Sequence, residues 1–241
     1  MTRGEPNGQQ PDGQFAPTQH ADAASHLPAF PSDLVDFMPS GTVETWQKIA
    51  PLVPAAAYLV GGTALTVHLR HRVSRDLDFF FDGHVDIDAL EAALQKIGKL
   101  ATTSKGPDTL NGVLGSTRIQ FLEARNQQQL AAPTHVAGIQ VASVEDILAM
   151  KLKVILDRGE LRDYFDIMRI DEHVVPVEEG IDLFMRRYGV GRGDNNIAAI
   201  LSTLSYLGDV ADDPMLPVKR PEIERYWTQR TPEIAKSFDR Y

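Results

Sequence analysis

The chain of 241 residues contains no cysteine, which excludes disulfides, thiolate zinc sites and a cysteine nucleophile. Its formal net charge of −9 argues against a protein whose whole surface binds nucleic acid, although it leaves room for local basic patches. No run approaches the roughly 20 apolar residues that span a bilayer, and the N-terminus lacks the basic-then-apolar pattern of a secretory signal, so we expect a cytoplasmic protein with no membrane partner.

The N-terminal part of the chain changes composition near residue 30. Residues 1–30 are rich in Gln, Gly, Pro, Asp and Ala. Such a segment buries too little apolar surface to offset its ordering entropy, and we predict a disordered tail. A helix is predicted over Thr42–Val53, with Ser40 or Thr42 as its cap.

Two apolar segments with strand character follow. Ala55–Val60 is closed by Gly61-Gly62, which indicates a buried strand entering a tight turn, and helical composition returns over Thr63–His71. Arg75–Phe81 reads RDLDFFF. In a strand, the alternation places Asp76 and Asp78 on one face and Leu77 and Phe79 on the other.

The next elements follow from caps and turns. Asp86 is predicted to cap an amphipathic helix whose apolar side carries Ile87, Leu90, Leu94 and Ile97. Thr109–Leu114 and Thr117–Leu122 are predicted to form a hairpin that turns at Gly115-Ser116.

The remainder of the chain is mainly helical. After a short strand at Ile139–Val141, Ser143 is predicted to cap a helix through Asp146–Leu156, with an interruption near Gly159. Further predicted helices are Asp163–Ile170, Glu178–Tyr188, Asn195–Leu207 and Pro221–Phe238. We therefore predict an α+β protein, with a mixed α/β lobe over residues 31–142 and a helical lobe over residues 143–241.

The glycines and the alternating acids suit one reaction, nucleotidyl transfer. Gly61 and Gly62 let the backbone approach a triphosphate, and the helix that begins at Thr63 directs its N–H groups to the same place. Asp76 and Asp78, about 6–7 Å apart along a strand, can ligate a metal pair from one face. Either motif alone is more often a turn or a pair of surface acids, and it is their order along the chain that favours an active site.

These segments resemble a known superfamily. VGGTAL followed by RDLDFF is similar to the nucleotidyltransferase superfamily of DNA polymerase β, and more narrowly to the AbiEii/AbiGii group of bacterial toxins. Members share a second segment like VEDILAMKLKVILDRGELRDYFDI, found here at Val144–Ile167. The resemblance implies a polymerase-β-like lobe joined to a helical lobe, Mg²⁺ dependence and NTP use. It also implies a cognate antitoxin and, in some relatives, nucleotide addition to the 3′ end of tRNA.

The second segment offers polar side chains at helical spacing. On an unbroken helix, Lys151, Arg158, Arg162 and Asp166 would form one stripe. The stripe is either ordinary salt bridging, such as an Arg162–Asp166 pair, or a phosphate site in which Lys151 and Arg158 hold the β- and γ-phosphates. The resemblance favours Lys151 and one of Asp163 or Asp166, and we favour Asp166 because it lies closer to Lys151. A bend at Gly159 would rotate the second half.

One departure from the family pattern concerns a third carboxylate. The pattern places it on a neighbouring strand, and the similar stretch here is Arg118-Ile119-Gln120-Phe121, with Gln120 in the acid's place. Glu123 is near but has the opposite strand parity. Three alternatives remain open: Gln120 serves as a neutral ligand, a helical Asp substitutes, or the chemistry is reduced.

The sequence thus predicts a Mg²⁺-dependent transfer of NMP from NTP to an acceptor hydroxyl, with the resemblance favouring a tRNA 3′ end that the basic run at Arg70–Arg75 contacts. One rival is transfer to a protein or a small molecule. The other is a degenerate fold that acts only as a binding partner. His68 and His71 lack the other residues of a metal motif, and we expect them at the surface.

Overall fold

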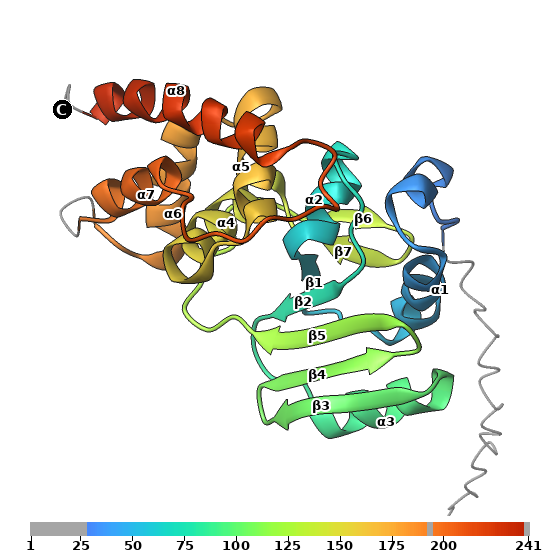
Figure 1. The fold of residues 1–241 in the computed structure, drawn as a ribbon. Coiled ribbons are helices and arrows are strands. Elements are labelled where there is room, and N and C mark those ends of the chain that lie inside the picture. Colours follow the sequence, from blue (N-terminus) through green and yellow to red (C-terminus); the bar gives the residue numbers. More distant parts are fainter. Residues whose placement is uncertain (1–27, 192–194, 239–241) are drawn as a thin grey trace, which may run out of the picture.

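The computed structural model describes residues 28–191 and 195–238. Within this part of the chain, seven strands form one sheet (Figure 1). The strands are β1 (Ala57–Val60), β2 (Leu77–Phe81), β3 (Leu100–Gly106), β4 (Thr109–Leu114), β5 (Thr117–Glu123), β6 (Thr134–Val136) and β7 (Ile139–Val141). The order is β3-β4-β5-β2-β1-β7-β6. The β2–β5 and β1–β7 pairs are parallel and the others are antiparallel, so the sheet is mixed.

Helices pack around this sheet, and α4 to α8 gather beyond one end of it (Figure 1). The α-helices are α1 (Ser40–Ile49), α2 (Gly61–Leu69), α3 (Ile87–Ile97), α4 (Val144–Arg158), α5 (Leu161–His173), α6 (Val177–Tyr188), α7 (Asn196–Ser205) and α8 (Arg220–Phe238). Two short 3-10 helices, η1 (Ser32–Phe37) and η2 (Ala50–Leu52), flank α1. The predicted α+β class is confirmed, and the strands precede α4–α8 in the chain.

Local sequence accounts for several of these elements. The Asp86 side chain accepts a hydrogen bond from the Ala89 amide and caps α3, as predicted. Ser143 does the same for the Asp146 amide at the start of α4. In β2 the burial alternates, with Leu77, Phe79 and Phe81 buried, and Phe79 stacks on Phe121 of β5 at 4.7 Å between ring centroids. Because of this alternation, the face of β2 that carries Asp78 points away from these buried side chains.

Other boundaries differ from the predictions. Strands β3 and β6 were not predicted, because each lies at a sheet edge and most of its side chains are exposed, which leaves no apolar pattern. Helix α1 begins at Ser40 after Pro39, and α2 begins already at Gly61. Gly61 adopts φ +72°, a conformation that glycine tolerates, so the chain turns from strand to helix within one residue.

The predicted interruption near Gly159 is present and divides the second family-like segment into two helices. Helix α4 ends at Arg158 and α5 begins at Leu161, with the backbone amide of Glu160 donating to Asp163 Oδ2 at 3.0 Å. The predicted tail falls almost wholly on residues 1–27, which lie outside the described residues. Among the described helices, none has the length and apolar content needed to cross a membrane.

Candidate active site beside Gly61 and Asp78

The two predicted motifs meet where β1 and β2 pair. The antiparallel register sets Val60 opposite Asp78, so the turn at Gly61 lies directly beside the Asp78 carboxylate. A Cβ at position 61 would lie 3.2 Å from Asp78 Oδ2. At position 62 it would overlap the guanidinium of Arg72. Glycine is therefore required here for close approach as well as for the turn.

The carboxylates of Asp76 and Asp78 line the same cavity. Asp76 precedes β2 by one residue and Asp78 lies within the strand. Asp76 Oδ1 is buried and has no hydrogen-bond partner among the described residues. Burial, followed by repulsion from Asp76, raises the pKa of Asp78 to about 6, although Lys151 and Arg162 partly offset these effects.

This pair of acids fits a divalent cation. Two half-buried carboxylates side by side are unfavourable without a counter-charge, and a buried oxygen without a partner among the described residues is the donor that a hard cation binds. In the described chain, no group of three or more acidic or histidine side chains is arranged to hold a metal. Mg²⁺ characteristically uses one or two carboxylates and completes its shell with water and substrate phosphates, so two acids suffice.

Gln120 occupies the place that the family pattern gives to a third acid. On β5 it is the register partner of Asp78, and its amide donates to Asn111 Oδ1 on β4 at 2.7 Å. Glu123 lies at the far end of β5, opposite Phe81 and paired with Arg125. The carboxylate of Glu123 is therefore not a substitute for the missing acid.

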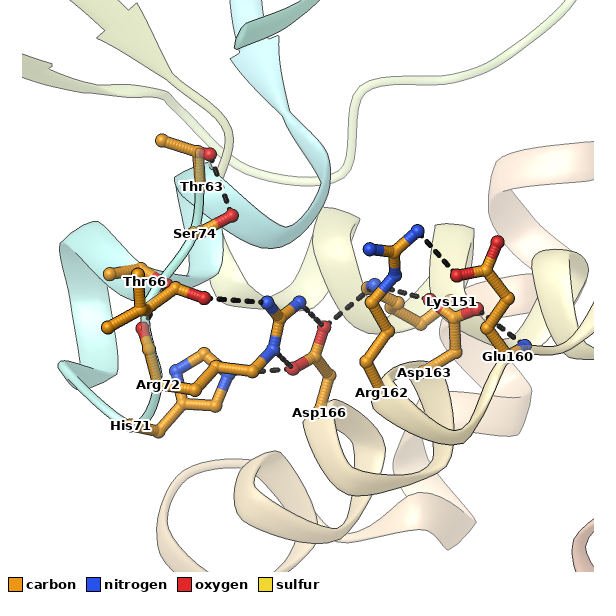
Figure 2. Close-up of polar contacts among 11 residues, drawn as sticks. Thr63, Thr66, His71, Arg72, Ser74, Lys151, Glu160, Arg162, Asp163 and Asp166 are labelled. Atoms are coloured by element: carbon orange, nitrogen blue, oxygen red, sulfur yellow. Dashed lines mark hydrogen bonds and ion pairs between the residues drawn. The ribbon is translucent and has the colours of Figure 1, made fainter. Parts of the chain in front are cut away.

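Asp166 stands at the centre of a buried ion cluster (Figure 2). Its Oδ1 accepts from Arg72 Nε at 2.6 Å and from His71 Nε2 at 2.7 Å. Its Oδ2 accepts from Arg72 Nη2 at 2.7 Å and lies 2.7 Å from Lys151 Nζ. Lys151 also donates to Asp163 Oδ1 at 2.6 Å. Burial alone would raise the pKa of Asp166, but Lys151 and Arg72 hold it well below its usual range.

This cluster decides one of the open alternatives. Both oxygens of Asp166 are taken by cationic or donor groups, so Asp166 does not substitute for the third metal-binding acid. The ammonium of Lys151 is buried between two carboxylates, whereas the sequence predicted a lysine free to hold phosphates. The alternative of an Arg162–Asp166 pair is not realised, although both residues lie on α5: Asp166 is occupied by Arg72 and Lys151, and Arg162 forms an ion pair with Glu160 instead.

Two further predictions need correction. Thr63 was predicted to bind the nucleotide, but it is buried below the cavity. Its hydroxyl lies 2.8 Å from the Ser74 hydroxyl (Figure 2). The same hydroxyl donates to the Asp76 carbonyl at 2.5 Å, so Thr63 holds the segment that carries Asp76. His71 was expected at the surface, but its side chain is buried, and burial lowers its pKa although Asp166 opposes that change.

Three adjoining cavities surround the acids. The smallest, of about 170 Å³, lies against Gly61, Gly62 and Lys151. A second, of about 510 Å³, extends over β4 and β5 past Asn111 and Gln120, and a third, of about 500 Å³, extends toward Met215. Each cavity is lined by basic side chains, among them Arg75, Arg118, Arg158 and Arg162.

Asp76 and Arg162 line all three cavities, whereas Asp78 lines only the first two. Sequence reasoning assigned no role in the site to Arg118. Its only sequence signal is its place two residues before Gln120, on the same face of β5.

Comparison with known proteins agrees with the resemblance found in the sequence. A model of the family described as "Nucleotidyl transferase AbiEii toxin, Type IV TA system" matches residues 50–129 and 117–240. An uncharacterized protein of Aquifex aeolicus is 28% identical over 177 residues, which cover 71% of this chain and 81% of that relative.

Two solved structures share the fold. JHP933 from Helicobacter pylori aligns with a TM-score of 0.54 and 18% identity, covering 88% of this chain and 96% of its own. MenT4, a nucleotidyltransferase toxin from Mycobacterium tuberculosis, aligns with a TM-score of 0.53 and 15% identity, covering 79% of this chain and 80% of its own.

Proposed function

This chain belongs to the AbiEii family of nucleotidyltransferase toxins and is therefore an enzyme of NMP transfer, and from that premise we propose that Asp76 and Asp78 bind Mg²⁺ and the NTP for this reaction. The observation that carries the proposal is the buried Oδ1 of Asp76, which has no hydrogen-bond partner in the described part of the chain and lies beside Asp78, whose pKa is raised to about 6. An uncompensated acidic pair next to a glycine turn suits a cation that also contacts a triphosphate.

The groups around the pair have separable tasks. The N-terminal amides of α2, at Gly61 and Gly62, accommodate phosphate oxygens without a side chain in the way. Arg158 and Arg162 line the same small cavity and supply positive charge to the β- and γ-phosphates. When bound, Mg²⁺ would supply charge neutralisation at the α-phosphate and activation of the acceptor hydroxyl.

The buried cluster supports these groups from behind. Lys151 remains at the wall of the small cavity but is held by Asp163 and Asp166, so its part is to position α4 against α5, and its charge also lowers the pKa of Asp78. Asp166 fixes the guanidinium of Arg72 behind Gly62. We assign Asp163 and Asp166 the same positioning role, with no contact to the metal.

The acceptor is proposed to be the 3′ end of a tRNA, on the resemblance of the VGGTAL and RDLDFF segments to relatives that use it. The partner is proposed to be a cognate antitoxin, because the family is described as the toxin of a toxin–antitoxin system. A cytoplasmic location is part of this proposal, since NTP and tRNA are both found there. Transfer to a protein or a small molecule is the alternative within the same chemistry.

The test is incubation with each labelled NTP, Mg²⁺ and total cellular RNA, comparing the parent with Asp76→Asn, which keeps the size of the side chain. Label in RNA with the parent alone supports the proposal. Label that enters protein or a small molecule overturns the tRNA acceptor, and no transfer to any acceptor overturns the assignment of the site. Melting temperatures of the two proteins, measured in parallel, show that both are folded.

A further inference from the structure

Three arginines around the site form no ion pair in the described part of the chain, although the charge of Arg118 lowers the pKa of Asp78. The side chains of Arg75, Arg118 and Arg158 make no hydrogen bond or ion pair with any described residue, although the chain has 33 acidic residues against 24 basic ones. Other arginines of the fold, such as Arg187 and Arg230, are bound to carboxylates. Unpaired arginines gathered at one place in an acidic protein indicate an anionic ligand there.

The three arginines divide between the two larger cavities. Arg158 lines the cavity over β4 and β5, Arg75 lines the cavity toward Met215, and Arg118 lies between them and lines both. Asp76 also lines both, while Asp78 and the small cavity at Gly61 belong to the Arg158 side. The metal-binding acids therefore stand at the border between two anion-binding spaces.

The cavity on the Arg75 side differs from the other in its apolar surface. Val73 is 44% exposed and Met215 is 66% exposed, and they are two of the five large hydrophobic residues found exposed in the described chain. Both line this cavity. The Met215 backbone amide donates to Asp213 Oδ1 at 3.0 Å, which braces the loop that carries it. The cavity on the Arg158 side has instead the polar Thr103, Asn111 and Gln120.

We propose that the cavity formed by Val73, Arg75, Arg118 and Met215, here named the acceptor cavity, binds the last nucleotides of a single-stranded RNA 3′ end. The inference rests on the proposed function and adds to it the side from which the acceptor enters. Arg75 and Arg118 bind backbone phosphates, and Val73 and Met215 pack against the face of a base. The NTP occupies the opposite side, with Gly61, Arg158 and Gln120.

This arrangement gives a direction to the reaction. The 3′-hydroxyl oxygen of the RNA, coming from the acceptor cavity, forms a bond to the α-phosphorus of the NTP. The bond from that phosphorus to the oxygen bridging to the β-phosphate breaks, and pyrophosphate leaves with the electron pair on the Arg158 side. The hydroxyl proton passes to solvent. Asp76, which lines both spaces, is placed to contact both reactants.

The first experiment separates the two sides with two exposed arginines and a matched control. Arg75→Ala is expected to raise KM for a short single-stranded RNA ending in CCA about tenfold and to leave KM for NTP unchanged, with the opposite pattern for Arg158→Ala. Arg225→Ala removes an exposed arginine of α8 that lines none of the three cavities and has no ion pair among the described residues, and it is expected to change neither KM.

A second measurement does not depend on turnover. Binding of the same RNA without NTP is followed by fluorescence anisotropy across a salt series. Arg75→Ala removes one phosphate contact and is therefore expected to lower the slope of log Kd against log salt by about one. Arg225→Ala is expected to leave the slope unchanged. Met215→Glu places a negative charge in the acceptor cavity and is expected to weaken RNA binding, whereas Met215→Leu keeps the apolar surface and is expected to bind as the parent does.

The outcomes are distinguishable. If the parent labels RNA and Arg75→Ala behaves like Arg225→Ala in both experiments, the acceptor cavity is wrong and the proposed function stands. If the parent labels no RNA with any NTP, both the tRNA acceptor and the acceptor cavity are overturned. A rise of KM for NTP with Arg75→Ala would show instead that the triphosphate occupies this side.

Discussion

At the scale of single residues, the carboxylate of Asp78 is held in a destabilising environment. Burial and the neighbouring Asp76 raise its pKa to about 6 in the metal-free protein, from an ordinary value of 3.8. A carboxyl group whose pKa is higher in the folded state stabilises the fold below its unfolded pKa, and that contribution is lost as the pH rises through the folded pKa. For Asp78 the free energy of unfolding should fall between about pH 4 and pH 6.

Asp78→Asn removes this penalty. We expect the variant, in metal-free buffer at neutral pH, to be more stable than the parent by about 1–2 kcal/mol after allowance for solvent screening, or a few degrees in melting temperature. Mg²⁺ should raise the melting temperature of the parent and leave that of the variant unchanged. A metal-free variant that melts below the parent at neutral pH would show that Asp78 is not desolvated.

Gln120 raises a second question at this scale, because it adjoins Asp78 in the sheet. Gln120→Glu adds a third carboxylate at the position where the family pattern has one, and a greater ligand charge tightens binding of a hard cation. We expect the Mg²⁺ concentration for half-maximal activity to fall about tenfold. Asn111→Asp adds the same charge two strands from Asp78 and serves as the control. If the parent and Gln120→Glu depend on Mg²⁺ equally, position 120 lies outside the metal shell.

At the scale of secondary structure, the ion cluster at Asp166 joins three elements. Asp166 on α5 binds Lys151 of α4 and also His71 and Arg72, which follow α2. The cluster lies directly behind the glycine turn, since Arg72 fills the space beside Gly62. The relative placement of α2, α4 and α5, and with it the base of the site, therefore depends on one buried carboxylate.

Asp166→Asn leaves Arg72 and Lys151 buried with less negative charge between them. We expect the free energy of unfolding to fall by about 3–5 kcal/mol, as for other broken buried ion pairs, and NMP transfer to be lost because Arg72 no longer supports the turn. Asp157→Asn, which removes the exposed partner of Lys153, is the matched control, with a change below about 0.5 kcal/mol. Urea denaturation gives both values, and a stable Asp166→Asn variant would contradict this role.

At the scale of the whole molecule, a second buried ion pair connects the sheet to the helices. Arg187 of α6 pairs with Asp146 at the start of α4, and its Nη2 donates to the Tyr58 hydroxyl of β1 at 3.3 Å. Asp146 also accepts from the backbone amides of Leu130 and Ala131. These contacts thus join β1, α4, α6 and the loop after β5.

Arg187→Met is expected to separate stability from catalysis. It leaves Asp146 buried without its cation, and the free energy of unfolding should fall by about 3–5 kcal/mol. Because Arg187 lines none of the three cavities, kcat and KM well below the melting temperature should stay close to those of the parent. A large fall in kcat at a temperature where the variant is fully folded would show that this contact set also positions the site.

Sequence patterns alone determined the elements that carry their own periodicity or cap. The buried strand before Gly61, the alternation around Asp78 and the cap at Asp86 are local features, and the resemblance of VGGTAL and RDLDFF to a nucleotidyltransferase family was sufficient to indicate the class of enzyme. Family membership confirms that class. The edge strands β3 and β6 escaped prediction because their stability comes from a neighbouring strand and not from an apolar face.

Only the tertiary structure decided which charges meet. Lys151 and Asp166 look from the sequence like exposed members of one helical stripe, yet the bend at Gly159 and the packing of α2 bury them together. The same packing places Arg75, Arg118 and Arg158 around the acids without an ion pair to any residue that the structure describes, and the β2–β5 register sets Gln120 beside Asp78. Periodicity fixes which face of an element a side chain occupies, whereas its partners come from segments distant in sequence, and their positions depend on how the elements pack.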